Sequence, residues 1–91
     1  MSTSSPAESL IVYPCDFPIK VMGLARDDFL PTMAGIARGF DPAFDAKTIE
    51  VRPSSGGRYV GLTLTVRVQS RAQLDDLYRA LHGHAMVSVV L

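Results

Sequence analysis

A stretch of alternating apolar and polar residues, Thr48–Gln69, constrains the fold of this chain more than any other segment. Its two alternating runs are joined by the sequence Ser54–Gly57, and such runs around a glycine-rich turn are typical of a β-hairpin. The second run has valine or leucine at every second position from Val60 to Val68. This pattern predicts a long strand that is buried on one face only, and its length favours a central place in a sheet.

Three other segments predict strands. Asp16–Leu24 alternates in the same way and ends at a glycine that marks the exit into a loop. Ala46–Pro53 forms the first half of the hairpin, and we expect Ile49 and Val51 to face inward. Met86–Leu91 predicts the last strand.

Two segments, Asp27–Gly39 and Ser70–His82, carry apolar residues at the 3.6-residue period of an amphipathic helix. The first opens with two aspartates, which suit an N-terminal cap. Ser70 and Gln73 have the spacing of a capping box, which predicts the start of the second helix. Gly35 costs about 1 kcal/mol relative to alanine inside a helix, which indicates either close packing or a marginal helix.

The element order strand, helix, strand, strand, helix, strand predicts an α+β fold. Two helices on one face of a four-stranded antiparallel sheet bury every apolar stripe, and right-handed crossovers give the strand order 4-1-3-2. This is the ferredoxin-like βαββαβ sandwich. We expect residues 13–91 to form this single domain and residues 1–12, of which the first nine are mostly small and polar, to form a disordered tail.

Composition narrows the classes of function. Nine basic and nine acidic side chains give a net charge of zero, so nucleic-acid binding is not favoured. The chain has one cysteine and no apolar run long enough for a membrane span, which predicts a cytoplasmic protein without membrane contact. A chain of 91 residues buries a thin core, which weighs against a deep catalytic site.

Three segments carry a family resemblance. They are Phe17–Gly23 (FPIKVMG), Pro53–Tyr59 (PSSGGRY) and Leu77–Leu81 (LYRAL), the last leading to a terminal Val90-Leu91. On these segments the chain resembles the YbeD-like family of small uncharacterised bacterial proteins from Tyr13 onward. The resemblance implies the ferredoxin-like fold, similar to the regulatory ACT domains that sense small molecules. It implies no activity and no catalytic residues.

Two surfaces are candidates for protein contacts. The last strand has no charge in six residues, and an edge strand without charge favours strand pairing with a protein partner or with a second copy. The second surface is the sheet face that points away from the helices, where the outward positions are mixed in character. Its candidate residues are Lys20, Arg52, Tyr59, Thr63, Thr65, Arg67, Met86, Ser88 and Val90.

A non-enzymatic regulatory or adaptor module is therefore our leading hypothesis, with no cofactor expected. The alternative is an ACT-like sensor, because in ACT-like domains the loop after the first strand binds small ligands. Here that loop would use Gly23, Arg26, Asp27 and Asp28. RNA binding is a weaker alternative, since RNA-reading sheets of this order need two or three exposed aromatics and only Tyr59 is available. The pair His82 and His84 does not complete a metal site.

Overall fold

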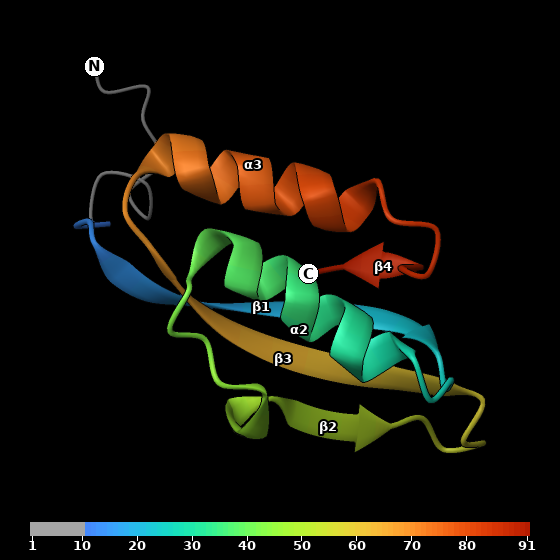
Figure 1. Ribbon diagram of the computed structural model, residues 1–91. Coiled ribbons are helices and arrows are strands. Elements are labelled where there is room, and N and C mark those ends of the chain that lie inside the picture. Colours follow the sequence, from blue (N-terminus) through green and yellow to red (C-terminus); the bar gives the residue numbers. More distant parts are fainter. Residues whose placement is uncertain (1–10) are drawn as a thin grey trace.

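The hairpin places its second strand at the centre of the sheet (Figure 1). The computed structural model describes residues 11–91. Its elements in chain order are β1 (Cys15–Leu24), α2 (Phe29–Phe40), the 3-10 helix η1 (Ala46–Thr48), β2 (Glu50–Pro53), β3 (Tyr59–Val68), α3 (Arg71–His82) and β4 (Val89–Val90). The strands pair antiparallel in the order β2-β3-β1-β4. The ferredoxin-like fold and the strand order expected from the sequence are confirmed.

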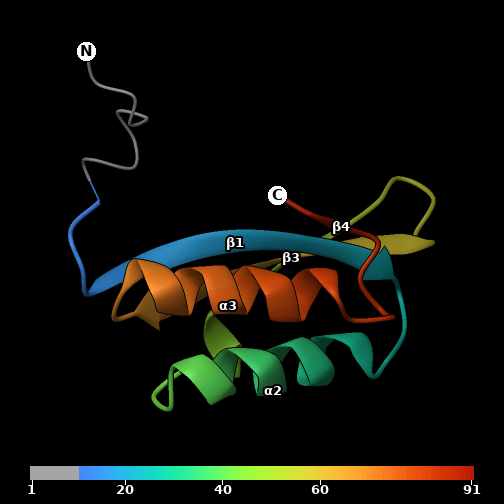
Figure 2. The ribbon, with the colours of Figure 1, turned by 90° about the horizontal axis from the view of Figure 1, so that it is seen from above.

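Both helices lie on the same face of the sheet, and within the described residues no helix covers the other face, which we call the open face (Figure 2). Between the two layers lies an apolar core, in which Ile19, Met33, Leu64 and Leu77 are fully buried. Within residues 11–91 no polar or charged residue is buried as a whole. None of the helices in this range has the length and apolar character needed to cross a membrane.

Polar groups of the hairpin form the hydrogen bonds that close its turn. The Ser54 N–H donates to the Tyr59 carbonyl (2.9 Å), and the Tyr59 N–H donates to Ser54 Oγ (3.1 Å). Gly57 has a φ of 72°, a conformation that favours glycine. Ser54 and Gly57 therefore stabilise the turn itself.

The helix start at Ser70 is confirmed, and the capping box is altered in one bond, because Gln73 accepts the N–H of Gln69 in place of that of Ser70. Ser70 Oγ accepts the Gln73 N–H (3.2 Å), while Gln73 Oε1 reaches back to the Gln69 N–H (2.7 Å). Gln73 Nε2 also donates to the Phe40 carbonyl at the end of α2 (3.1 Å). One side chain thus caps α3 and joins it to α2.

The first half of the hairpin is shorter than the sequence pattern predicts. Ala46–Thr48 forms η1, because Asp45 Oδ1 accepts the Lys47 N–H (2.9 Å) and closes a tight turn. Ile49 is buried as expected, but Val51 is 53% exposed. Val51 pairs with buried Leu62 and so faces the helix side, yet β2 is an edge strand that the helices leave open there.

The predicted face of the last strand is wrong. Val90 pairs with Val21, which is buried under the helices, so Val90 faces the core side and Val89 faces the open side. Met86 packs against the core, and Ser88 precedes the two-residue strand. The segment from His84 to Ser88 turns instead of extending, since His84 Nδ1 accepts the Met86 N–H (3.1 Å). A register change of one residue exchanges the two faces of a strand.

The predicted tail, residues 1–12, lies outside the described residues except for its last two. Val12 is 77% exposed, and Tyr13 packs against the core where the predicted domain begins.

Candidate functional site

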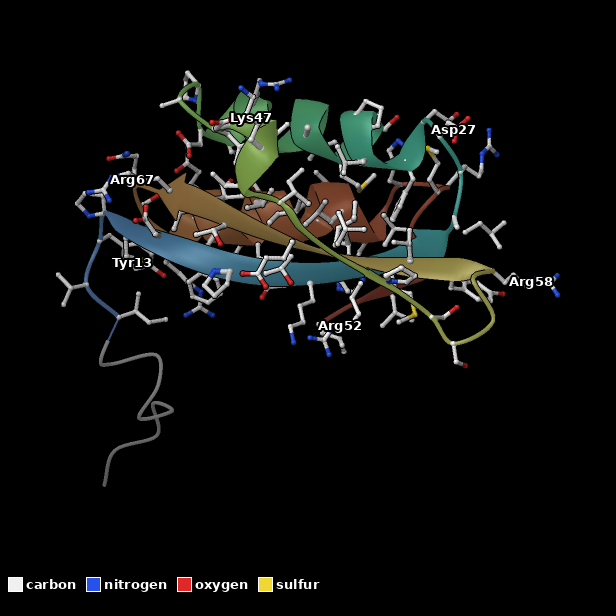
Figure 3. The ribbon with its side chains drawn as sticks, turned by 90° about the horizontal axis from the view of Figure 1, so that it is seen from below. Tyr13, Asp27, Lys47, Arg52, Arg58 and Arg67 are labelled. Atoms are coloured by element: carbon white, nitrogen blue, oxygen red, sulfur yellow. The ribbon has the colours of Figure 1, made fainter. Side chains whose placement is uncertain are left out.

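The open face of the sheet carries a hollow of about 410 Å³, to which all four strands contribute. We call it the sheet hollow. It is lined by Lys20, Val21, Met22, Glu50, Val51, Arg52, Pro53, Ser54, Tyr59, Gly61, Leu62, Thr63, Val89 and Leu91. Figure 3 shows Arg52 on the side of the sheet that points away from the helices.

Gly61 forms the floor of the sheet hollow. It lies in the middle of β3, where Met22 is its partner on β1 and Arg52 its partner on β2. Directly opposite residues share a face of the sheet, so the glycine leaves a gap between two long side chains. A Cβ at this position would have the Arg52 carbonyl as its neighbour, at 3.6 Å, an ordinary contact. Packing within the sheet therefore does not require glycine here, and glycine inside a strand often marks a close approach of a ligand or another chain.

Exposed apolar side chains gather around this floor. Met22 and Leu24 come from β1, Tyr59 from β3, and Val89 and Leu91 from the C-terminal segment. Leu91 is 71% exposed and exchanges both backbone hydrogen bonds with Lys20 (3.2 and 2.8 Å), which places it on the same face. Clustered apolar residues with polar neighbours mark interaction sites on protein surfaces.

Charge in the sheet hollow comes from Lys20, Arg52 and Glu50. None of the three has an ion pair within residues 11–91. Arg67 differs, since it pairs with Asp16 on the same face at 3.2 Å. The sheet hollow thus offers two cations that form no ion pair with the described part of the chain.

The register places most of the predicted interaction surface as expected. Lys20, Arg52, Tyr59, Thr63, Thr65 and Arg67 all lie on the open face, while Met86 and Val90 do not. The sequence interpretation missed Gly61, Val89 and Leu91. The alternation of β3 places Gly61 at an outward position, and a glycine inside a strand was the signal in the sequence that could have identified it. The other two depend on the register of β4, which alternation over six residues does not determine.

The predicted ligand loop lies apart from the sheet hollow. Figure 3 shows Asp27 on the helix side, across the sheet from Arg52. Gly23 is closely packed, because a Cβ there would collide with the Met86 carbonyl and with the Phe29 ring (2.8 Å). Its lack of a side chain is therefore required by the fold.

The polar groups of that loop bind each other. Arg26 donates to both carboxylate oxygens of Asp28 (3.1 and 3.0 Å), and both side chains are exposed. Asp28 occupies the cap position of α2 without a side-chain hydrogen bond to the helix, so the expected aspartate cap is wrong. Ligand binding by this loop stays a prediction, and neither hollow described here includes it.

A second hollow, of about 540 Å³, lies between α3 and the start of β1. Ile11, Phe17, Leu74 and Tyr78 give it an apolar floor, and charged residues of α3 surround it. This second hollow lies beside the first half of β1, which has no partner in β4, since β4 pairs only with Val21 and Met22.

Within residues 11–91 no three His, Cys, Asp or Glu side chains come close enough to hold a metal ion. His82 stacks on Tyr78 with ring centroids 6.5 Å apart, and His84 accepts a backbone N–H. Both histidines therefore have contacts that serve the local structure.

Comparison with known proteins places the chain in a family. The model of the family described as "Protein of unknown function (DUF493)" matches residues 8–91. A UPF0250 protein of Bordetella parapertussis is 60% identical over 91 residues, covering all of both chains. One from Paraburkholderia phymatum is 63% identical over 84 residues, covering 92% of this chain and 94% of its own.

A solved structure shares the fold. Protein HP0495 from H. pylori superposes with a TM-score of 0.69 over 99% of this chain and 98% of its own, at 12% sequence identity. The YbeD-like resemblance seen in the sequence is confirmed: the chain belongs to the DUF493 family of uncharacterised bacterial proteins.

Proposed function

We propose that this protein is a non-enzymatic regulatory or adaptor module of the cytoplasm that binds a protein partner through the sheet hollow. The observation that supports this most is the cluster of exposed apolar side chains around Gly61 on the uncovered face. An apolar centre with a polar surround is the usual anatomy of a protein interface.

The open face of the sheet is a better contact surface for a partner protein than the edge strands are. β4 is two residues long, so its outer edge offers few backbone groups for strand pairing. Beyond Lys20, the next residue of β1 that directs its backbone to this edge is Pro18, which has no N–H. The proposal therefore keeps the protein partner and moves its contact from the C-terminal edge to the sheet face.

RNA fits the sheet hollow less well than a protein partner does. Single-stranded RNA is held by stacking on two or three aromatic side chains, and Tyr59 is the aromatic residue that lines the sheet hollow. The aliphatic residues Met22, Val89 and Leu91 suit apolar side chains of a protein.

Photo-crosslinking in the native cell tests the proposal. A benzoylphenylalanine at Thr63 inside the sheet hollow should give an adduct with one partner protein, and the same group at Asp76 on the exposed side of α3 should not. Gly61→Leu fills the floor and should abolish the adduct, while thermal unfolding shows whether the variant is folded. An adduct of equal yield in Gly61→Leu, or none at Thr63, contradicts the proposal.

A further inference from the structure

The charges of the sheet hollow point to the chemistry of its occupant. We propose that the partner contributes an acidic segment, with an apolar side chain over Gly61 and carboxylates on Lys20 and Arg52. This inference rests on the proposed function, because it assumes that the sheet hollow is the contact surface.

Two cations flank the floor from opposite sides. Lys20 lies on β1 and Arg52 on β2, with β3 between them. Lys20 is level with Thr63 and Arg52 with Gly61, so two strand spacings and two residues along the strands separate their Cα atoms by about 12 Å. A chain that crosses the hollow between them can present carboxylates to both, and a guanidinium can bind a carboxylate through two hydrogen bonds.

Lys20 and Arg52 have no carboxylate partner within residues 11–91, a state that they share with Arg38, Lys47 and Arg58 outside the sheet hollow. Within residues 11–91, Arg26, Arg67 and Arg79 have carboxylate partners, whereas Lys20 and Arg52 have none. Glu50 is the one carboxylate side chain among the residues that line the hollow. The side chains of the lining therefore include two cations and one carboxylate, in a chain whose net charge is zero.

A second copy of this chain fits less well. Packing two open faces together would place four cationic side chains, Lys20 and Arg52 of each copy, against two Glu50 carboxylates, and the surplus of like charge opposes association. An acidic partner removes this repulsion and adds favourable pairs. The apolar residues around Gly61 then receive the side chain between the acidic positions.

NMR titration of the full chain with designed peptides tests the inference. The acidic probe is acetyl-GDELFEDG-amide and the basic probe is acetyl-GKRLFRKG-amide, which keeps the Leu-Phe anchor and reverses the charge. We expect amide shifts at Met22, Gly61 and Thr63 with the acidic probe, at a half-saturation about tenfold lower than with the basic probe, a difference of about 1.4 kcal/mol. The double variant K20E/R52E should reverse the order of the two probes.

Three outcomes overturn the inference. One is equal response to both probes, and another is an unchanged order in K20E/R52E. The third is no shift around Gly61 at about 5 mM acidic peptide, where even a Kd of about 1 mM would give extensive binding. Octauridylate serves as a further arm, and tighter binding of this RNA at the same amides would assign the cations to phosphate. If the peptides fail while the Thr63 adduct forms, the proposed function stands and the acidic partner falls.

Discussion

Two glycines of this chain meet opposite surroundings, and the same substitution should have opposite effects at them. Gly23 is buried where β1 ends, and a Cβ there would overlap a backbone carbonyl, which cannot move aside as a flexible side chain can. We predict that Gly23→Ala lowers the free energy of unfolding by about 2–3 kcal/mol, since overpacking forces backbone shifts. Urea denaturation with a constant m-value measures this.

Gly35 is the matched control. It is exposed in α2, and a Cβ there would meet nothing within 4 Å, so close packing does not explain this glycine. Gly35→Ala should therefore raise the free energy of unfolding by about 1 kcal/mol through helix propensity. Destabilisation at both positions would contradict the assignment.

Gln73 connects three parts of the chain through one amide. Its oxygen accepts the Gln69 N–H and its nitrogen donates to the Phe40 carbonyl, so removal loses a cap and a link between the helices. We predict that Gln73→Ala costs about 2 kcal/mol and Ser70→Ala about 1 kcal/mol, because the serine makes a single cap bond. Thermal unfolding of both variants measures these losses of stability. An equal loss in the two variants would indicate that the hydrogen bond to Phe40 contributes nothing to stability.

At the scale of the elements, two prolines lie where the sheet has free edges. Lys20 exchanges both hydrogen bonds with Leu91, so the even-numbered residues of β1 direct their backbone groups toward that edge, Pro18 included. On β2 the Ser54 N–H bonds to β3, which directs the backbone of Pro53 outward at the other edge. Both prolines thus remove a donor from an edge that could pair with another chain.

Pro18→Val restores such a donor and should promote self-association. We predict a folded protein whose unfolding free energy changes by less than about 1 kcal/mol, but which forms dimers or larger species as concentration rises. Sedimentation velocity measures this, with the exposed loop variant Pro42→Val as the control. Dimers of the unaltered chain would show instead that its edges pair despite the prolines, as the uncharged last strand first indicated.

The sequence pattern predicted the helices and strands better than it predicted the register of β4 and the residues that form the sheet hollow. Alternation over ten residues in β1 and β3 was long enough to give both strands and their buried face. β4 has two residues, and its register comes from contacts of the preceding turn, where the Met86 carbonyl packs on Gly23. The same limit hid the sheet hollow, because the role of Gly61 appears only when Met22 and Arg52 are placed beside it.

At the scale of the whole molecule, one face of the sheet contributes to the core and the other face is available for contacts. The helices cover one face and supply an apolar core, which leaves the other face free to vary without loss of the fold (Figure 2). The described ion pairs have side chains between 50 and 70% exposed, and such pairs contribute little to stability. We therefore predict that K20E/R52E changes the free energy of unfolding by less than about 0.5 kcal/mol, so its effect on binding can be read directly.

Tyr13 should make the stability of the folded chain depend on pH in the alkaline range. Its hydroxyl oxygen is buried and has no hydrogen-bond partner within the described part of the chain. Burial raises the pKa of Tyr13 above the ordinary 10.0, and negative charge at Cys15 and Asp75 raises it further. The folded state thus holds this proton more tightly than the unfolded state does. The stabilisation is complete below about pH 10 and is lost as the pH rises through the folded pKa.

Tyr13→Phe removes the titrating group and tests this directly. The variant should match or exceed the parent in stability at pH 7, because no hydrogen bond is lost. Between about pH 9.5 and 11 the parent should lose stability more steeply than the variant, as measured by urea denaturation at each pH. Tyr59→Phe, at an exposed position on the open face, is the control and should keep the slope of the parent. If Tyr13→Phe also keeps that slope, the alkaline loss arises from another group, and the buried hydroxyl of Tyr13 does not govern it.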